Sequence, residues 1–417
     1  MMLIDRVRKF VANPWFYIAV RKYKLISFLY RLVYLPYLVK RLRTNDNITV
    51  LFVLYELGAW KTENLYLKML KHNRFNPQLL LVENLAENYA FKIFSEYLKM
   101  KGYNYSILNS NESIQRKLNP DIIFYQKPYV EIMHKNLTFP YNLNSLFCHV
   151  EYCFRNRNIP GRRIPYYYYV WQHYVENNSI VSETKMLKVN NSGNMRFTGL
   201  PVMDTLLKDK REFIDPWKQI KKKRIIFAPH HTVTTNKLKF TSPFNYATFF
   251  VFAEFMLEMV EKYRDSVQWA FKPHPLLRAK LYEIWGKEKT DIYYLKWQEL
   301  ENTQLFEGEY MGLFKHSDAM IHDCGSFKLE YLYTGNPVMY LIKEEQEFDF
   351  PNWQTRESLK LHYHGKTQID IESFIVNVIN ENDPLRGERE AFVENYLTPP
   401  HGKTACDNII DSILGEQ

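Results

Sequence analysis

Residues 317–341 constrain the fold of this chain most, because they read as strand, tight turn, helix, glycine turn and second strand. An apolar run from Ala319 to Ile321 ends in a polar turn, where Gly325 permits a sharp bend and Ser326 is placed to cap a helix. Gly335 ends that helix, and residues 338–341 resume as a buried strand. The segment therefore predicts one βαβ unit of a parallel sheet.

The turn between this strand and its helix is a place where the phosphates of a nucleotide can bind. The first N–H groups of a helix are free, and the helix dipole is positive at that end. The same unit also occurs in proteins that bind nothing at the turn. This segment alone does not choose between the two interpretations.

Two upstream strands end in polar turns of the same kind. Residues 224–228 run into two histidines, and residues 269–271 run into a lysine and a histidine between prolines. The carboxyl ends of parallel strands meet at one edge of a sheet, where open α/β sheets bind ligands. We therefore predict a candidate active site that contains His230, His231, Lys272, His274, His322, Asp323 and Ser326.

A chain of 417 residues is too long for one ordinary core and suits two α/β domains facing across a cleft. Strand-like and helix-like segments alternate through residues 44–207. The composition then becomes charged, and a second α/β domain is predicted for residues 208–385. Residues 386–417 have helical periodicity, and we expect this tail to pack back on the first domain.

Several function classes are disfavoured by what the sequence lacks. No Gly-x-Gly occurs, so neither the dinucleotide fingerprint nor the Walker loop is present. The four cysteines form no CxxC pair and no signal peptide opens the chain, so we expect a cytoplasmic protein. No cysteine or carboxylate completes a ligand set beside the paired histidines at 230–231 and 362–364, so we expect no metal.

Residues 1–43 hold ten Lys or Arg and one acid, a net charge of +9 that equals the charge of the whole chain. Within them Leu25, Phe28, Leu29 and Leu32 fall at helical spacing, and the apolar run is too short to span a bilayer. We predict a basic, aromatic, amphipathic arm that lies on an anionic membrane surface. The alternatives are a solvated helix or an arm for nucleic acid, and the second is disfavoured because the remaining chain has no basic excess.

At these motifs the chain resembles the CDP-glycerol glycerophosphotransferase family, the teichoic-acid-polymerase-like enzymes of GT-B architecture. The Asp-x-Ser-Ser-x-x-x-Asp element of the family corresponds to residues 323–330. Its Thr-Gly-x-Pro-x-x-Asp, Ala-Pro and Lys-x-His-Pro motifs correspond to residues 198–204, 228–231 and 272–275. Here Gly325 replaces the first serine and Glu330 replaces the aspartate. The Trp-His-Gly-Thr-Pro motif of the family is absent, and His149 is its nearest equivalent.

The resemblance implies a GT-B fold with two Rossmann-type domains, an N-terminal acceptor side and a C-terminal side for the donor nucleotide. It implies transfer of a polyol phosphate, most simply glycerol phosphate from CDP-glycerol, to a hydroxyl of a surface-polysaccharide or lipid-linked acceptor. The closest match is to members associated with capsule synthesis. CMP would leave, no cofactor would be needed, and the enzyme would work as a peripheral protein on the inner face of the cell membrane.

The residues suit this chemistry, because phosphoryl transfer needs positioning and positive charge near developing anionic oxygens. Histidine is the side chain whose ordinary pKa suits a base near neutrality, so the predicted catalytic base is His149, His231 or His274. Glu330, one helical turn after the turn serine, is placed to bind ribose hydroxyls. We expect the donor to contact His230, Lys272, His322, Asp323, Cys324, Gly325, Ser326 and Glu330.

The thiol of Cys324 has two interpretations. A position next to a helix N-terminus can lower the pKa of a thiol and make it reactive. A buried, inert cysteine fits the same sequence.

Two other functions stay open. A GT-B glycosyltransferase that uses a nucleotide sugar needs the same kind of donor domain, because a fold does not determine a function. The other is a membrane-bound scaffold that has lost catalysis, and the intact His230, His274, Asp323 and Ser326 argue against it.

Overall fold

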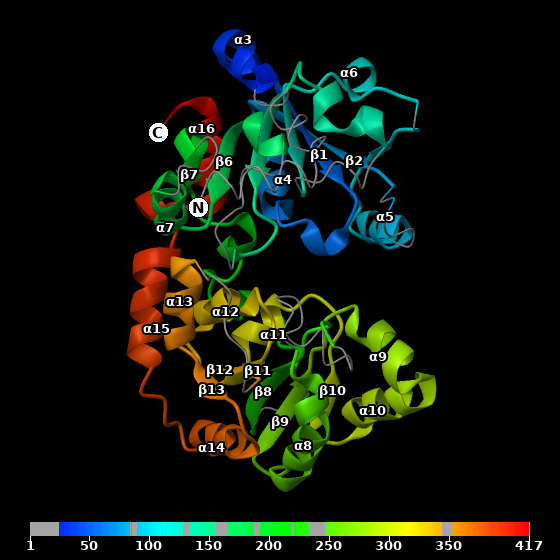
Figure 1. The fold of residues 1–417 in the computed structure, drawn as a ribbon, viewed down its shortest axis with the longest axis vertical. Coiled ribbons are helices and arrows are strands. Elements are labelled where there is room, and N and C mark those ends of the chain that lie inside the picture. The colour runs from blue at the N-terminus through cyan, green and yellow to red at the C-terminus, as the bar shows by residue number, and fades with distance from the viewer. Residues whose placement is uncertain are drawn as a thin grey trace, which may run out of the picture. The chain divides into compact units, whose positions relative to one another are not determined.

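The computed structural model describes residues 25–83, 85, 90–109, 111–127, 134–155, 165–186, 192–218, 221–233, 247–343 and 352–416. They divide into two compact units, and most of their helices and strands are labelled in Figure 1. Unit 1 takes the chain up to Cys153, the stretch 158–204 and the residues from Pro399 onward. Unit 2 takes residues 154–157 and 205–398.

Unit 1 is built on a parallel sheet of seven strands in the order β3-β2-β1-β4-β5-β6-β7. The strands are β1 Ile48–Leu54, β2 Phe75–Leu81, β3 Ser106–Ile107, β4 Ile122–Tyr125, β5 Leu146–Val150, β6 Val170–Val175 and β7 Met195–Phe197. The central strand β1 is buried along almost its whole length, as its continuous apolar sequence predicts.

The α-helices labelled in the described part of unit 1 are α3 Leu35–Thr44, α4 Glu63–Leu70, α5 Ala90–Met100, α6 Ile114–Lys117, α7 Asn178–Met186 and α16 Ala405–Leu414. Helix α4 packs against β2, and α7 packs against β6 and β7. The C-terminal helix α16 contacts α4, so the end of the chain belongs to the first sheet.

The motif at residues 198–204 has a structural role that explains its residue types. Asp204 accepts hydrogen bonds from the backbone N–H groups of Ala405 and Cys406 at 2.7 and 3.0 Å, so it holds the first turn of α16. Gly199 has a φ of +80°, and a Cβ atom there would lie 2.9 Å from Cγ of Pro399. Both features attach the C-terminal segment to the sheet.

Unit 2 is built on a parallel sheet of six strands in the order β10-β9-β8-β11-β12-β13. The strands are β8 Lys223–Ala228, β9 Val267–Phe271, β10 Thr303–Leu305, β11 Ala319–His322, β12 Val338–Leu341 and β13 Tyr363–Gly365. Counted along each unit, the first six strands of both sheets follow the order 3-2-1-4-5-6 of the Rossmann fold. The βαβ unit predicted for residues 317–341 is confirmed as β11, a short helix and β12.

Helices cover both faces of the second sheet. On one face α8 Phe249–Lys262, α9 Leu277–Trp285, α10 Lys287–Glu299 and α14 Gln368–Ile379 share a core with the strands. That core contains Phe227, Trp269, Phe271, Phe252, Trp297 and Phe374. On the other face, Tyr340 of β12 packs against Leu359 of α13 Trp353–Lys360. The remaining helices are α11 Met311–Lys315, α12 Phe327–Glu330 and α15 Arg386–Phe392.

The helix after β11 differs from its prediction. Helix α12 continues as a 3₁₀ turn to Thr334, and Gly335 ends it with a φ of 71°, as expected. Ser326 stands at the N-cap position but makes no side-chain capping bond, so that part of the prediction is wrong. Its backbone is helical, with φ −72° and ψ −34°, whereas a capping serine has an extended backbone.

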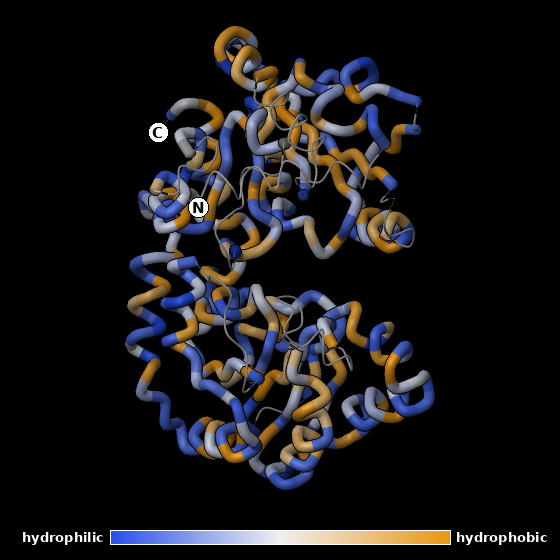
Figure 2. The backbone as a smooth tube through the Cα atoms, viewed as in Figure 1, coloured by the Kyte–Doolittle hydropathy of each residue, from blue (hydrophilic) through white to orange (hydrophobic). Residues whose placement is uncertain are grey.

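Residues 25–44 form a helical segment with two different faces, while residues 1–24 of the predicted arm lie outside the described residues. One face packs on unit 1 through the buried Tyr30, Leu38 and Leu42. The other face, which we call the apolar face, is exposed and consists of Leu25, Phe28, Leu29, Leu32 and Val33. In Figure 2 helix α3 shows both orange and blue, because its leucines and Val39 alternate with Lys40, Arg41 and Arg43.

The membrane-arm prediction needs one correction in the described part. Arg31 points into the protein, where it donates to the carbonyl oxygens of Tyr168 and Val170 at 2.9 and 2.8 Å. Its burial lowers the pKa of the guanidinium to about 10. This charge is therefore used internally and not for lipid phosphates. None of the helices in the described residues is long and apolar enough to cross a membrane.

Candidate active site

The predicted site of unit 2 lies where the strand order reverses, between the carboxyl ends of β8 and β11. The backbone N–H of His230 donates to Oδ1 of Asp323 at 2.6 Å. The N–H and hydroxyl of Thr248, which precedes α8, donate to Oδ2 at 2.6 and 2.9 Å. Asp323 is fully buried, and burial raises its pKa to about 6 although these bonds favour the carboxylate. The carboxylate predicted to contact a donor therefore serves as the internal support of the site.

Three imidazoles meet beside this carboxylate. The ring centroids of His231 and His274 are 4.0 Å apart, and those of His230 lie 4.2 and 4.8 Å from them. All three side chains are half-buried. Burial, followed by the nearby histidines, lowers the pKa of His230 to about 2, and burial lowers that of His274 to about 3. The pKa of His231 is also lowered, chiefly by burial. These rings are therefore neutral at neutral pH.

The tautomers of two rings follow from the backbone. The N–H of Leu276 points at Nδ1 of His274 at 3.2 Å, and the N–H of Thr232 points at Nδ1 of His230 at 3.3 Å. A backbone N–H can only donate, so both Nδ1 atoms are acceptors and both Nε2 atoms carry the proton. The three rings lie close enough to hold a metal ion, but a ring that binds one through Nε2 must have lost the proton there. In this arrangement His230 and His274 therefore present Nε2–H groups as hydrogen-bond donors.

A lysine and a carboxylate complete the edge. The ammonium of Lys272 lies 4.9 Å from the ring centroid of Tyr310 and 5.7 Å from that of Phe327, which is cation–π range. The hydroxyl of Tyr310 donates to Glu330 at 2.7 Å. Glu330 is 2% exposed, so the carboxylate predicted for ribose is buried against a tyrosine that the sequence did not indicate.

The turn after β11 is buried except at its end. His322 is fully buried, its Nδ1 accepts from the N–H of Cys324 at 3.1 Å, and burial lowers its pKa well below the ordinary value. The thiol of Cys324 donates to the carbonyl of Ala228 at 3.2 Å, and burial raises its pKa well above the ordinary value. This thiol is inert at neutral pH. Gly325 is buried, whereas Ser326 is half-buried and its hydroxyl caps nothing.

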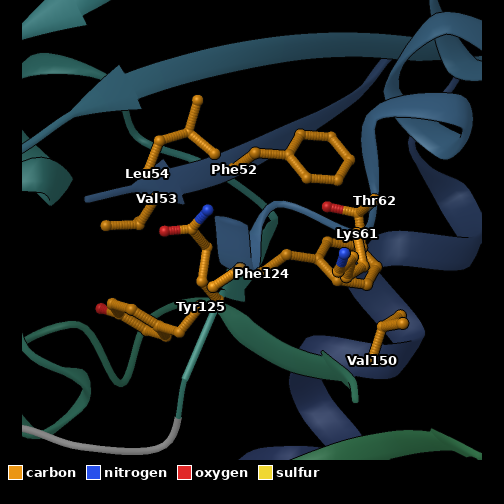
Figure 3. A pocket seen from close by; sticks show the side chains of 10 residues that line it. Phe52, Val53, Leu54, Lys61, Thr62, Phe124, Tyr125 and Val150 are labelled. Carbon is orange, nitrogen blue, oxygen red and sulfur yellow. The ribbon is translucent and has the colours of Figure 1, made fainter. Parts of the chain in front are cut away.

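At the corresponding edge of unit 1, the described ends of β1 and β4 are joined by a glutamine. The side-chain oxygen of Gln126 accepts the backbone N–H groups of Tyr55 and Glu56 at 2.8 and 3.0 Å, and its amide donates back to the carbonyl of Glu56. Figure 3 shows the hollow at this edge, lined by residues that include Phe52, Tyr125 and Val150. Its cavity of about 10 Å³ holds no more than one water molecule.

The third predicted base is placed apart from the others. His149 lies in β5 of unit 1, is 0% exposed, and packs edge-on against Tyr166 and Tyr167. The structure thus brings the predicted residues of unit 2 to one edge, and it leaves His149 in the other unit.

The chain matches no protein-family model and no curated protein sequence. Solved structures do resemble it. A putative UDP-N-acetylglucosamine 2-epimerase from Listeria monocytogenes has a TM-score of 0.58 at 15% identity, over 89% of this chain and 96% of that chain. The UDP-GlcNAc 2-epimerase from Neisseria meningitidis bound to UDP-GlcNAc has a TM-score of 0.57 at 15% identity, over 89% and 100%. A histidine-to-asparagine variant of the wall teichoic acid polymerase TagF has a TM-score of 0.58 at 13% identity, over 99% and 97%.

The fold is GT-B-like. The predicted α/β class with two Rossmann-type domains is therefore confirmed. At these identities the similarity establishes the fold alone, and the reaction has to be argued from the site.

Proposed function

We propose that unit 2 binds the diphosphate of a nucleotide-linked donor and that the protein transfers a phosphate-linked group from it. The observation that carries this proposal is the cluster of neutral imidazoles at the edge where the strand order reverses. His230 and His274 present Nε2–H donors there, and the cation of Lys272 follows β9 at the same edge. Fixed donors and one positive charge are what an anionic diphosphate requires.

We propose CDP-glycerol, or a related CDP-polyol, as the donor. The four motifs at residues 198–204, 228–231, 272–275 and 323–330 support this choice, and the teichoic acid polymerase shares the fold. An acceptor hydroxyl attacks the β-phosphorus, a new O–P bond forms, and the bridging oxygen leaves with CMP. Charge develops on that bridging oxygen and on the nonbridging oxygens, which the imidazole donors and Lys272 stabilise.

The attacking hydroxyl must lose its proton to a base. His231 is half-buried, stands in the cluster, and its Nδ1 accepts no hydrogen bond from the described residues. His274 has no bare nitrogen for this proton, since its Nδ1 accepts from the N–H of Leu276 and its Nε2 is protonated. A bound diphosphate raises the pKa of an adjacent imidazole, because the anion favours its charged form, so His231 becomes a stronger base once the donor is in place. His149 stays the third prediction, and its full burial is the observation against it.

The acceptor is proposed to be a surface polysaccharide or a lipid-linked glycan at an anionic membrane. The exposed apolar face of residues 25–33 supports membrane contact, since large apolar side chains on one side of a helix insert at the boundary between headgroups and acyl chains. Lys40 and Arg43 are exposed on the same helical segment and suit anionic lipid, whereas Arg41 pairs with Asp121 of unit 1 at 3.5 Å.

A second candidate is an enzyme of nucleotide sugars, favoured by the UDP-GlcNAc 2-epimerases among the similar structures. The assay that separates the two uses the full chain with CDP-glycerol, CDP-ribitol and UDP-GlcNAc. Release of CMP with an acceptor supports the proposal, whereas epimerisation or release of UDP from UDP-GlcNAc supports the second candidate.

Variants locate the activity. We expect His274→Ala and Ser326→Ala each to lower turnover by at least about a hundredfold, the usual scale for losing an acid–base or oxyanion contact. His364→Ala, at an exposed histidine of β13, serves as the control and should keep its activity. If both site variants turn over CDP-glycerol like the control, the proposed site is misplaced.

A further inference from the structure

Unit 1 contains a second cluster of titratable groups, made of His149, Glu151 and His173. His149 of β5 and His173 of β6 are direct partners in the strand register. Glu151 follows His149 by two residues, which places it on the same side of the chain, since side chains along a strand alternate. The two imidazole centroids are 4.9 Å apart. The three side chains are only 0%, 5% and 2% exposed.

The ligand atoms of this cluster converge. Oε1 of Glu151 lies 2.7 Å from Nε2 of His173 and 3.5 Å from Nε2 of His149. All three residues offer atoms within 4.8 Å of one another. The ring of Tyr167 stacks on His173 with centroids 5.2 Å apart, so an aromatic side chain covers this imidazole of the cluster.

One member of the cluster lacks a hydrogen-bond partner. Both ring nitrogens of His149 are buried, and neither is hydrogen-bonded. Leaving a buried polar group unsatisfied costs about 1–3 kcal/mol. A cation between Nε2 of His149 and the Glu151 carboxylate would satisfy one of these nitrogens and neutralise a buried charge.

We propose that His149, Glu151 and His173 bind a divalent transition-metal ion of the Zn²⁺ type. Two imidazoles and one carboxylate are a common ligand set for Zn²⁺, and with bonds of about 2.0–2.2 Å the ligand atoms stand about 3.3 Å apart. The distances of 2.7 and 3.5 Å in the cluster bracket that value. Three protein ligands leave the fourth tetrahedral position for a water or another ligand.

This inference is independent of the proposed function, and it changes one role. A histidine whose Nε2 binds a metal ion has no lone pair there for a proton, so a metal-bound His149 is not the catalytic base. The sequence prediction of no metal overlooked this set, because His173 joins His149 only through the register of β5 and β6.

Binding is tested on the full chain after dialysis against EDTA, with Co²⁺ and Zn²⁺ as the probes. We expect one equivalent of Co²⁺ to bind with visible d–d absorption, and Zn²⁺ to displace it. The Nδ1 of His149 lacks the outer-shell partner that most ligating histidines have, so the affinity should be lower than that of closed structural zinc sites. No binding by the wild-type chain up to millimolar cation would overturn the proposal.

Two variants and one control assign the ion. Loss of an outer-shell partner alone weakens metal binding about 10–100-fold. Glu151→Gln and His173→Gln each remove a ligand itself, so we expect each variant to bind Co²⁺ more than about a hundredfold more weakly than the wild type. His231→Gln alters the other histidine cluster and should bind Co²⁺ like the wild type. Wild-type affinity in Glu151→Gln would overturn the assignment.

X-ray absorption of the wild-type chain loaded with Zn²⁺ does not depend on whether the variants fold. Two imidazoles and a carboxylate oxygen are expected around the ion. Three imidazoles would place the ion at residues 230, 231 and 274 and would exclude the proposed site.

Discussion

The backbone N–H of His230 donates to Oδ1 of Asp323 at 2.6 Å, and this bond joins the ends of β8 and β11 at the point where the strand order reverses. The other carboxylate oxygen holds Thr248 in front of α8. Asp323 thus positions the loop that carries the histidine cluster.

Asp323→Asn tests this support. An amide presents N–H donors on one side, whereas the described groups of His230 and Thr248 all donate to Asp323, so one donor would face another. Because the variant leaves a buried donor unsatisfied and loses a charge-assisted bond, we expect its free energy of unfolding, measured in urea, to be lower by about 3 kcal/mol. The control is Glu330→Gln, a buried carboxylate that accepts from Tyr310 and can do so as an amide. Equal stability of both variants would contradict the supporting role.

The stability of the protein should fall as the pH drops below about 6.5. Burial lowers the pKa of His362 to about 3 and that of His322 well below its ordinary value. In the unfolded chain both histidines titrate near pH 6.5, so below that pH the unfolded state binds more protons than the folded state. Each histidine then lowers the free energy of unfolding by up to about 1.4 kcal/mol per pH unit. Asp323 acts in the opposite direction, because its pKa is raised to about 6 in the folded state, so between about pH 4 and 6 the folded state binds this proton more readily. In that range Asp323 offsets the destabilisation caused by one histidine.

Urea unfolding from pH 8 to pH 5 measures this effect. His362→Gln should make the unfolding free energy depend less steeply on pH below 6.5, because the variant has one buried histidine fewer to protonate on unfolding. An unfolding free energy independent of pH over this range would show that these histidines become protonated in the folded protein.

The outline of the site could be predicted because its signals are local. Each of β8, β9 and β11 is an apolar run that ends in polar residues, and parallel strands bring such ends to one edge. The partners could not be predicted, because they are set by packing over long distances in sequence. Thr248 lies 75 residues from Asp323 in the chain, and Tyr310 meets Glu330 only after α11 and β11 have folded between them.

The sequence analysis does not predict strand β6, although residues Val170 to Val175 are mostly apolar or aromatic. Without that strand, the sequence does not indicate that His173 is the neighbour of His149. The prediction that Ser326 caps a helix is wrong for a different reason. Residue type favours a cap at Ser326, but the backbone there is already helical.

Donor binding should take up protons. In the free protein burial lowers the pKa of His231, and Nδ1 of this ring accepts no hydrogen bond from the described residues. A bound diphosphate shifts this pKa upward, so a fraction of the His231 rings gains a proton, and affinity should rise as the pH falls from 8 to 6. CDP-glycerol is a suitable probe, since its esterified diphosphate has no ionisation of its own in this range.

Calorimetry in buffers of different ionisation enthalpy measures the uptake directly. His231→Gln should reduce it, and cytidine, which has no phosphate, should cause none. Proton release on binding of CDP-glycerol would contradict neutral histidines at the donor site.

The apolar face of the N-terminal helical segment should be needed for membrane binding. Phe28, Leu29 and Leu32 are 61%, 54% and 63% exposed, while Tyr30 and Arg31 on the other side hold the helix on unit 1. Substituting these three with serine therefore removes apolar surface and leaves the buried contacts in place. Burying one such side chain contributes about 1.5–3 kcal/mol, so we expect the triple variant to bind anionic vesicles at least about a hundredfold more weakly.

The matched control replaces Ile107, Ile292 and Ile369 with serine, since these side chains are 53%, 52% and 77% exposed on other elements. Co-sedimentation with vesicles containing phosphatidylserine measures both variants. High salt should weaken binding of the intact chain without abolishing it, because salt screens the basic residues and leaves apolar insertion unaffected. If the control loses as much binding as the triple variant of the apolar face, insertion of this helix is not what holds the protein at the membrane.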